Sequence, residues 1–222
     1  MKLSIELSPG ANYVIAVNLA EAVNRIFFAT IPIVEEKVKR LVKESLEASP
    51  EYSSIINGQL KGELGLPNPD VTIDAVIEFI VNAVKVEFKP FKIFPTGLVR
   101  GEYNVYIIRP TIEELTALPN AAIVTERGYV LEWLDWLLTY GGKIIIRGHE
   151  VDFDLSTSDR QRSRTGLALM RRGLTEDDGV WRVPSQFRGN ASDNFIIRSF
   201  KNTGYKIKKI IESSVGEAIV KL

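Results

Sequence analysis

The sequence contains no cysteine and only one histidine, His149, among its 222 residues. Without cysteine the chain has no disulfide framework, no thiolate metal site and no cysteine nucleophile. A structural zinc site needs four ligands drawn mainly from Cys and His, so we expect no metal centre. His149 stands between Gly148 and Glu150 at a predicted turn, a position more typical of an exposed residue than of a catalytic one.

Motifs of nucleotide and hydrolase chemistry are also missing. The glycine clusters do not match G-x-G-x-x-G or a Walker A loop, and there is no G-x-S-x-G. Asp152 and Asp154 are close in sequence, but paired carboxylates near a turn are usually solvated, and no second acidic cluster suggests metal ligation. We therefore expect a protein that is not an enzyme and that takes no cofactor.

The chain also lacks a charge imbalance, with 28 basic and 28 acidic residues. This balance argues against a nucleic-acid footprint over the whole protein, which would need an excess of basic residues. The first ten residues lack the charged-then-apolar order of a signal peptide. No uninterrupted apolar run approaches the roughly 18 residues of a membrane span. We expect a protein made in the cytoplasm that has no membrane contact.

The clearest predicted helix runs from Asn18 to Ala48, with Asn18 as its N-cap. Pro32 is expected to kink or divide it, because proline removes a backbone donor. The half before Pro32 is rich in apolar residues, including Phe27 and Phe28. It packs on the core of its own domain, or part of it meets another subunit, as large exposed apolar patches often do. Residues 1–17 predict a short strand or an arm.

The rest of the chain predicts short strands between helices. Residues 84–93 alternate strictly and predict a strand, which 103–108 partners across a loop at 95–97. Residues 143–153 predict either a strand pair turning near Gly148 or one strand broken there. Helices are predicted at 72–83, 111–118, 129–140 (compact, apolar and buried) and 193–220 (amphipathic). The fold class is therefore α+β: an antiparallel sheet flanked by the long N-terminal helix, the buried apolar helix and the C-terminal helix, in a single domain spanning 1–222.

Residues 158–200 contain eight arginines and five acids. An Arg/Ser-rich loop around Arg160, Arg162, Arg164 and Gly166 opens this segment, and Arg171 and Arg172 follow a short apolar run. An acidic turn at 176–178, a second apolar run at 180–183 and a helix beginning near Phe195 come next. The arginines fit an ordinary charged loop, a subunit contact through bidentate pairs, or phosphate contact without sequence reading. Gly166 predicts a special backbone conformation or a close approach.

Several motifs in this segment resemble neck proteins of tailed bacteriophages, of the tail-completion or head–tail joining class. They are Ser163-Arg164-Thr165-Gly166, Ala168-Leu169-Met170, Trp181-Arg182-Val183-Pro184, Phe187, Gly189 and Asp193-Asn194-Phe195-Ile196. The run from Ser49 to Ile55, with Gly58 and Leu60, is similar to the segment that follows the first helix in those proteins.

The resemblance implies a structural subunit of the virion, made in the host cytoplasm and assembled into a homo-oligomeric ring at the head–tail junction. Its partners would be copies of itself, other neck, portal or tail proteins, and DNA in the channel through non-specific contact. The candidate subunit-interface or DNA-facing residues are Arg160, Arg162, Arg164, Gly166, Arg171, Arg172, Phe27 and Phe28. The alternative function is a nucleic-acid-binding module that uses the arginine-rich 160–172 loop.

Overall fold

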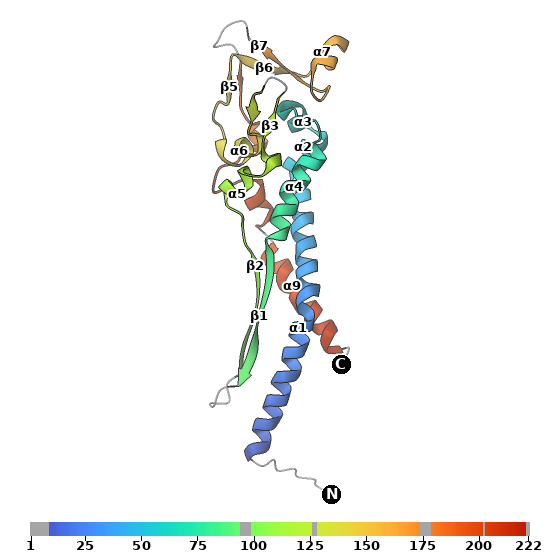
Figure 1. Cartoon of the computed structure of the whole chain (residues 1–222), viewed down its shortest axis with the longest axis vertical. Helices are drawn as coiled ribbons and strands as arrows, with labels where there is room; N and C mark the ends of the chain where they lie inside the picture. Colours follow the sequence, from blue (N-terminus) through green and yellow to red (C-terminus); the bar gives the residue numbers. More distant parts are fainter. Residues whose placement is uncertain (1–8, 94–98, 126–127, 174–178, 202, 221–222) are drawn as a thin grey trace. The chain divides into compact units, whose positions relative to one another are not determined.

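The computed structural model describes residues 9–93, 99–125, 128–173, 179–201 and 203–220 (Figure 1). The fold is α+β, with 58% of the described residues helical and 18% in strands, which confirms the predicted class. The chain divides into two compact units that each combine distant segments. Unit 1 comprises residues 1–40, 84–108 and 205–222, and unit 2 comprises residues 41–83 and 109–204. The expectation of a single domain stays a prediction.

The helices are α1 (Pro9–Glu47), α2 (Pro50–Asn57), α3 (Gln59–Leu64), α4 (Pro69–Asn82), α5 (Ile112–Thr116), η1 (Pro119–Ala121), α6 (Trp133–Asp135), η2 (Trp136–Tyr140), α7 (Thr157–Arg162), η3 (Ser185–Phe187), α8 (Phe195–Ser199) and α9 (Thr203–Val220). The strands are β1 (Val84–Ile93), β2 (Val99–Ile107), β3 (Ile123–Val124), β4 (Val130–Leu131), β5 (Ile146–Arg147), β6 (His149–Asp152), β7 (Leu169–Arg172) and β8 (Val180–Trp181). They form four separate two-stranded antiparallel ladders, where the sequence predicted one sheet.

Helix α1 is longer than predicted. It begins at Pro9, so Asn18 is not its N-cap, and residues 9–17 are helical where a strand or an arm was expected. Pro32 lies inside α1 and does not divide it. A proline costs a helix one hydrogen bond, and burial of neighbouring positions offsets that cost, since Thr30 and Val34 are fully buried.

The hairpin of β1 and β2 forms the sheet of unit 1. The bounds of β1 match the prediction, whereas β2 begins four residues earlier than expected, at Val99. The register of the β1–β2 pairing shifts between Lys89 and Lys92. Pro90 lies at this point and has no backbone N–H to donate to the ladder. The Asn24 side chain of α1 satisfies the backbone at this irregularity, because its Nδ2 donates to the Phe91 carbonyl (3.1 Å) and its Oδ1 accepts from the Phe91 amide (2.7 Å). The predicted loop at 95–97 lies outside the described residues.

The strands of unit 2 show which of the two interpretations of residues 143–153 is correct, a strand pair turning near Gly148 or one strand broken there. Strands β5 and β6 do not pair with each other: β5 pairs with β8, and β6 pairs with β7. Gly148 separates them at φ +68°, a backbone conformation that favours glycine. One strand broken at Gly148 is therefore the correct interpretation, and the strand pair is wrong.

Two predicted helices are built from shorter pieces. Residues 129–140 form β4, the single turn α6 and the π-helix η2, which ends at Gly141 with φ +51°. Their burial matches the prediction, since Trp133, Leu134, Leu137 and Leu138 are all buried. The predicted helix 193–220 is formed by two helices, α8 and α9.

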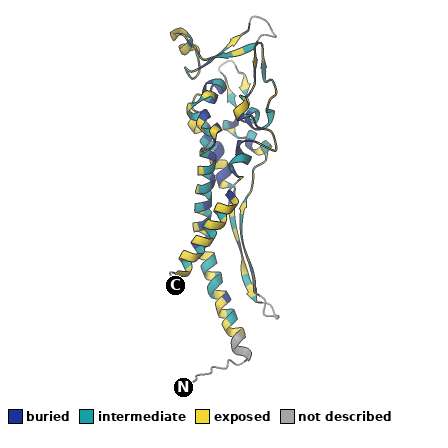
Figure 2. Cartoon of the chain, turned by 180° about the vertical axis from the view of Figure 1, so that it is seen from behind, coloured by how far each residue is buried: buried dark blue, intermediate teal, exposed yellow. Residues whose placement is uncertain are grey.

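The first half of α1 is poorly covered by its own chain. Figure 2 colours it almost entirely exposed or intermediate. In the part of the chain that the structure describes, the stretch Tyr13–Glu47 is the one helix long and apolar enough to cross a membrane, and 6% of its apolar window is buried. Length and composition alone do not separate a membrane span from a helix that another protein covers, so the expectation of no membrane contact stays a prediction.

Candidate functional site at the arginine segment

The predicted arginine loop begins as a helix. Ser156 caps α7, and its Oγ accepts a hydrogen bond from the Asp159 amide (3.2 Å). Beyond α7, the Ser163 Oγ accepts from the Gly166 amide (3.1 Å) and donates to the Ala168 carbonyl (2.5 Å), which closes the loop. Gly166 has φ +69°, and a Cβ there would meet nothing within 4 Å. Glycine is therefore favoured at position 166 by its backbone conformation and not by a close approach.

Arg171 has a structural role within unit 2. Its Nε donates to Asp152 Oδ2 (2.6 Å), and its Nη2 donates to Asp159 Oδ2 (2.9 Å). The Ser156 hydroxyl and the Arg171 guanidinium both hydrogen-bond the Asp159 carboxylate and hold its pKa below its ordinary value. Arg171 thereby ties β7 to β6 and to α7.

The other candidate arginines are exposed. Arg162 reaches Asp159 at 3.9 Å, a weak pair at the surface. The side chains of Arg160 and Arg172 form no hydrogen bond or ion pair with any described residue. His149 is opposite Arg172 in the β6–β7 ladder, and its Nδ1 lies 3.1 Å from the Arg147 carbonyl.

Arg164 differs from its neighbours because its guanidinium lies against the backbone of Gly65. A Cβ at Gly65 would come within 2.7 Å of an Arg164 Nη atom, and Gly65 also has φ +61°. Partial burial of the guanidinium lowers the pKa of Arg164, although the residue as a whole remains exposed. Glycine at position 65 thus leaves room for the arginine.

A cavity of about 180 Å³ lies between α3, the 163–170 loop and β8. It is lined by both polar and apolar side chains, among them Glu63, Arg164, Leu131, Trp136, Met170 and Trp181. This volume holds roughly six waters at about 30 Å³ each, or one apolar side chain.

Glu63 is the half-buried carboxylate of this cavity, and no motif in the sequence indicated it. Its Oε2 accepts from Trp181 Nε1 (3.0 Å), and its Oε1 accepts from Gln59 Nε2 (2.5 Å). Burial raises the pKa of Glu63, and the two hydrogen bonds partly oppose that shift. The cavity lies between α3, which begins within the first segment that carries the resemblance, and Trp181 of the second segment.

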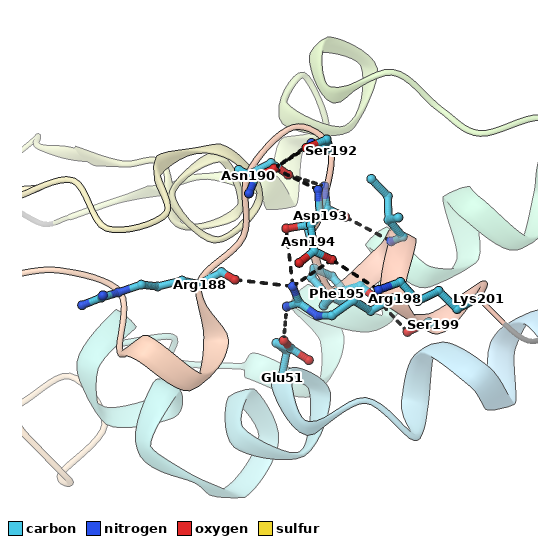
Figure 3. Close-up of polar contacts among 11 residues, drawn as sticks. Glu51, Arg188, Asn190, Ser192, Asp193, Asn194, Phe195, Arg198, Ser199 and Lys201 are labelled. Atoms are coloured by element: carbon cyan, nitrogen blue, oxygen red, sulfur yellow. Dashed lines mark hydrogen bonds and ion pairs between the residues drawn. The ribbon is translucent and has the colours of Figure 1, made fainter.

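A second link between these segments is an ion pair (Figure 3). Arg198 of α8 donates from Nη2 to Oε1 of Glu51 in α2 at 2.5 Å, and the Glu51 side chain is only 2% exposed. The Arg198 Nη1 also donates to the carbonyls of Arg188 and Asp193, each at 3.4 Å, and lies 3.5 Å from the Asp193 carboxylate. Sequence reasoning gave no signal for this pair, whose members are separated by 147 positions.

Most residues that carry the resemblance have structural roles. Trp181, Val183, Phe187 and Phe195 are buried. Asn194 caps α8, with its Oδ1 accepting from the Ile197 amide (3.1 Å). The motifs of residues 163–196 therefore specify the packing of unit 2 more than they present a surface. The predicted acidic turn at 176–178 lies outside the described residues.

The two phenylalanine candidates have different environments in unit 1. The Phe27 ring stacks on Phe88 at 5.2 Å and contacts Phe91 and Tyr103. Phe28 is 50% exposed, and its one ring contact among the described residues is a T-shaped contact with Phe88, with the ring centroids 5.0 Å apart. Of the two, Phe28 is the one that could contact another subunit without unit 1 being rearranged.

Among the described residues, no three or more His, Cys, Asp or Glu side chains are placed to hold a metal ion. No protein-family model matches this chain, and no curated protein or solved structure matches it either.

Proposed function

We propose that this chain is a structural subunit of a tailed-phage virion, forming part of a homo-oligomeric ring at the head–tail junction as a neck, tail-completion or tail-terminator protein. The observation that carries the proposal is the contact between Glu51 and Arg198. It joins the two segments that resemble neck proteins, residues 49–60 and 158–200. Because these segments pack together in unit 2, the resemblance covers one packed unit and not scattered short matches.

Two exposed surfaces support an assembly role. A closed cyclic ring needs two different, complementary surfaces on each subunit. Unit 2 offers the exposed arginines of 160–172, and unit 1 offers the exposed Phe28 of α1. Guanidinium groups and large apolar side chains are both common in protein interfaces. The partners in this proposal are copies of the chain and the adjoining neck, portal or tail proteins.

The decisive experiment is to locate the protein in phage particles. An antibody to the chain would be applied with gold label to particles from a lysate of its source. Label concentrated where the head meets the tail is the expected result. Label elsewhere on the tail would keep a virion role but reject the junction. A protein found only in the soluble fraction, with no label on intact or tail-disrupted particles, would reject the virion role.

A nucleic-acid-binding module is the second candidate function. The observation that favours it is the exposure of Arg160 and Arg172, whose side chains have no partner among the described residues. Phosphate binding through such residues weakens steeply with salt, because bound counterions are released. Binding of the isolated chain to double-stranded DNA at low salt, lost as salt rises, would support it, and no binding at low salt would exclude it.

A further inference from the structure

Helix α1 carries a row of six apolar residues at alternating spacings of four and three. They are Ile15, Leu19, Ala22, Ile26, Ala29 and Ile33. We call this row the α1 seam. Its spacing is the heptad repeat of coiled coils, in which two of every seven positions face a partner helix. The next two positions of the same repeat are Glu36 and Arg40, so the apolar row ends there.

The α1 seam does not face the core of unit 1. Leu19 is 64% exposed, Ile15 52% and Ile33 45%, and Ala29 is exposed as well. The side of α1 that its own chain buries carries Ala20, Thr30, Val34 and Val38. At 3.6 residues per turn, the two sides are centred about 110° apart on the helix. The seam is therefore a second apolar side of α1 that no described residue covers fully.

A lipid bilayer fits this face poorly. Glu21 and Arg25 are exposed in the middle of the same stretch, and both would enter the hydrocarbon if it spanned a membrane. Charged side chains in membrane helices almost always face protein or water, because their burial in lipid is costly. Lipid chains also impose no heptad spacing, whereas a partner helix does.

We infer that the α1 seam packs against the α1 seam of a second copy of this chain. The seam supplies what such packing requires: large side chains at positions 19, 26 and 33, alternating with alanines at 22 and 29 that allow the helices to approach closely. A patch that complements itself forms a two-fold contact without any other protein. This inference does not rest on the proposed function, and it concerns only how two copies meet.

The seam is short, and its length predicts that a contact made by the seam alone is weak. From position 15 to position 33 it spans about 28 Å, or fewer than three heptads. Isolated coiled coils are sustained over three or four heptads. We therefore choose an experiment that detects transient pairing at defined positions.

The experiment is disulfide cross-linking of the full chain, which has no native cysteine. The variants L19C and A29C place a thiol on the seam, alone and mixed in equal amounts. V14C is the matched control, because Val14 is 56% exposed on the same helix but lies about 100° from the seam. We expect dimers to form at least tenfold faster at the seam positions than at V14C. The A29C dimer indicates parallel helices and the mixed L19C–A29C dimer indicates antiparallel ones. Equal rates at V14C, or no cross-links at the seam, would overturn the inference.

Acidic substitutions test the same contact without an oxidant. L19E should abolish self-association in sedimentation velocity at high protein concentration, and V14E should not. Both variants should keep the wild-type melting temperature, since both positions are exposed. Flotation with vesicles of zwitterionic and anionic phospholipid tests the bilayer: flotation of the wild type that L19E and V14E both abolish, with the chain monomeric in solution, would overturn the inference. Gold label at the head–tail junction without seam cross-links would reject the seam and leave the proposed function standing.

Discussion

Arg198 and Glu51 form a 2.5 Å ion pair that joins α8 to α2. Glu51 is fully buried, whereas Arg198 keeps about a third of its side chain in water. The arginine also donates to two backbone carbonyls, so its guanidinium fixes the turn before α8 as well as the helix pair.

Removing the carboxylate of this pair should destabilise the protein. Glu51→Ala is expected to lower the free energy of unfolding by about 1–3 kcal/mol, because charged hydrogen bonds are lost in a buried site. The matched control is Glu78→Ala, which breaks the largely solvent-exposed Lys43–Glu78 pair (2.7 Å) of the same unit. That change should cost no more than about 1 kcal/mol. Urea unfolding of both variants measures the difference, and equal costs would show that the Glu51 pair adds little.

Glu63 should make stability depend on pH. Burial raises the pKa of Glu63 in the folded state, so folding favours its protonated form. Its contribution is fully present below the ordinary glutamate pKa and is lost as pH rises through the raised folded value. Glu63→Gln should remove this loss of stability. The melting temperature of the variant, compared with that of the wild type at the same pH, should therefore rise between about pH 4 and pH 7. Glu212→Gln, at an exposed position on α9, is the control and should not alter the profile. Parallel wild-type and E63Q profiles would contradict the prediction.

Replacing the exposed arginines should impair assembly without unfolding the protein. In the triple variant Arg160→Ala, Arg162→Ala and Arg172→Ala, we expect a melting temperature within a few degrees of the wild-type value and a loss of particle infectivity. The control removes three exposed lysines, Lys85, Lys92 and Lys206, and thus the same charge. Particle yield and plaque counts measure the effect. If the triple arginine variant assembles infectious particles at wild-type levels, these residues are not an assembly surface.

Two glycine-to-alanine substitutions should change the stability of the protein in opposite directions. Gly166→Ala places a side chain at φ +69° and should destabilise the protein by about 1–2 kcal/mol. Gly216→Ala lies inside α9, where a Cβ meets nothing within 4 Å, and should stabilise it by about 0.5–1 kcal/mol. Thermal unfolding separates the two. A neutral Gly166→Ala would mean that the loop relaxes into another backbone conformation.

The sequence predicted elements well where local chemistry decides them. The strict alternation of residues 84–93 gave β1 at its correct bounds. The helix predicted at 111–118 is present as α5, and its N-cap Thr111 forms a full capping box with Glu114. Both signals depend on side chains that act within a few residues of their own backbone, so no distant segment is needed to read them.

The predictions failed for those elements in which tertiary packing outweighs the local conformational preference of the sequence. Of the two effects predicted for Pro32, the division of α1 is wrong, because the helix continues through it next to buried Thr30 and Val34. The strands around Gly148 were found, but their partners were not, because β5 pairs with a strand more than thirty residues away. The apolar run 129–140 was correctly predicted to be buried, yet its backbone is partly π-helical.

The sequence by itself determined the α+β class, the burial of the 129–140 segment and the exposed arginines, since composition, periodicity and charge are properties of the chain. Only the tertiary structure decided which groups meet. It placed Glu51 on Arg198 and Glu63 on Trp181, it packed Phe27 against Phe88, and it left most of the seam of α1 exposed. The physical reason is that periodicity shows that a helix has apolar sides, whereas long-range contacts decide which of those sides its own chain covers.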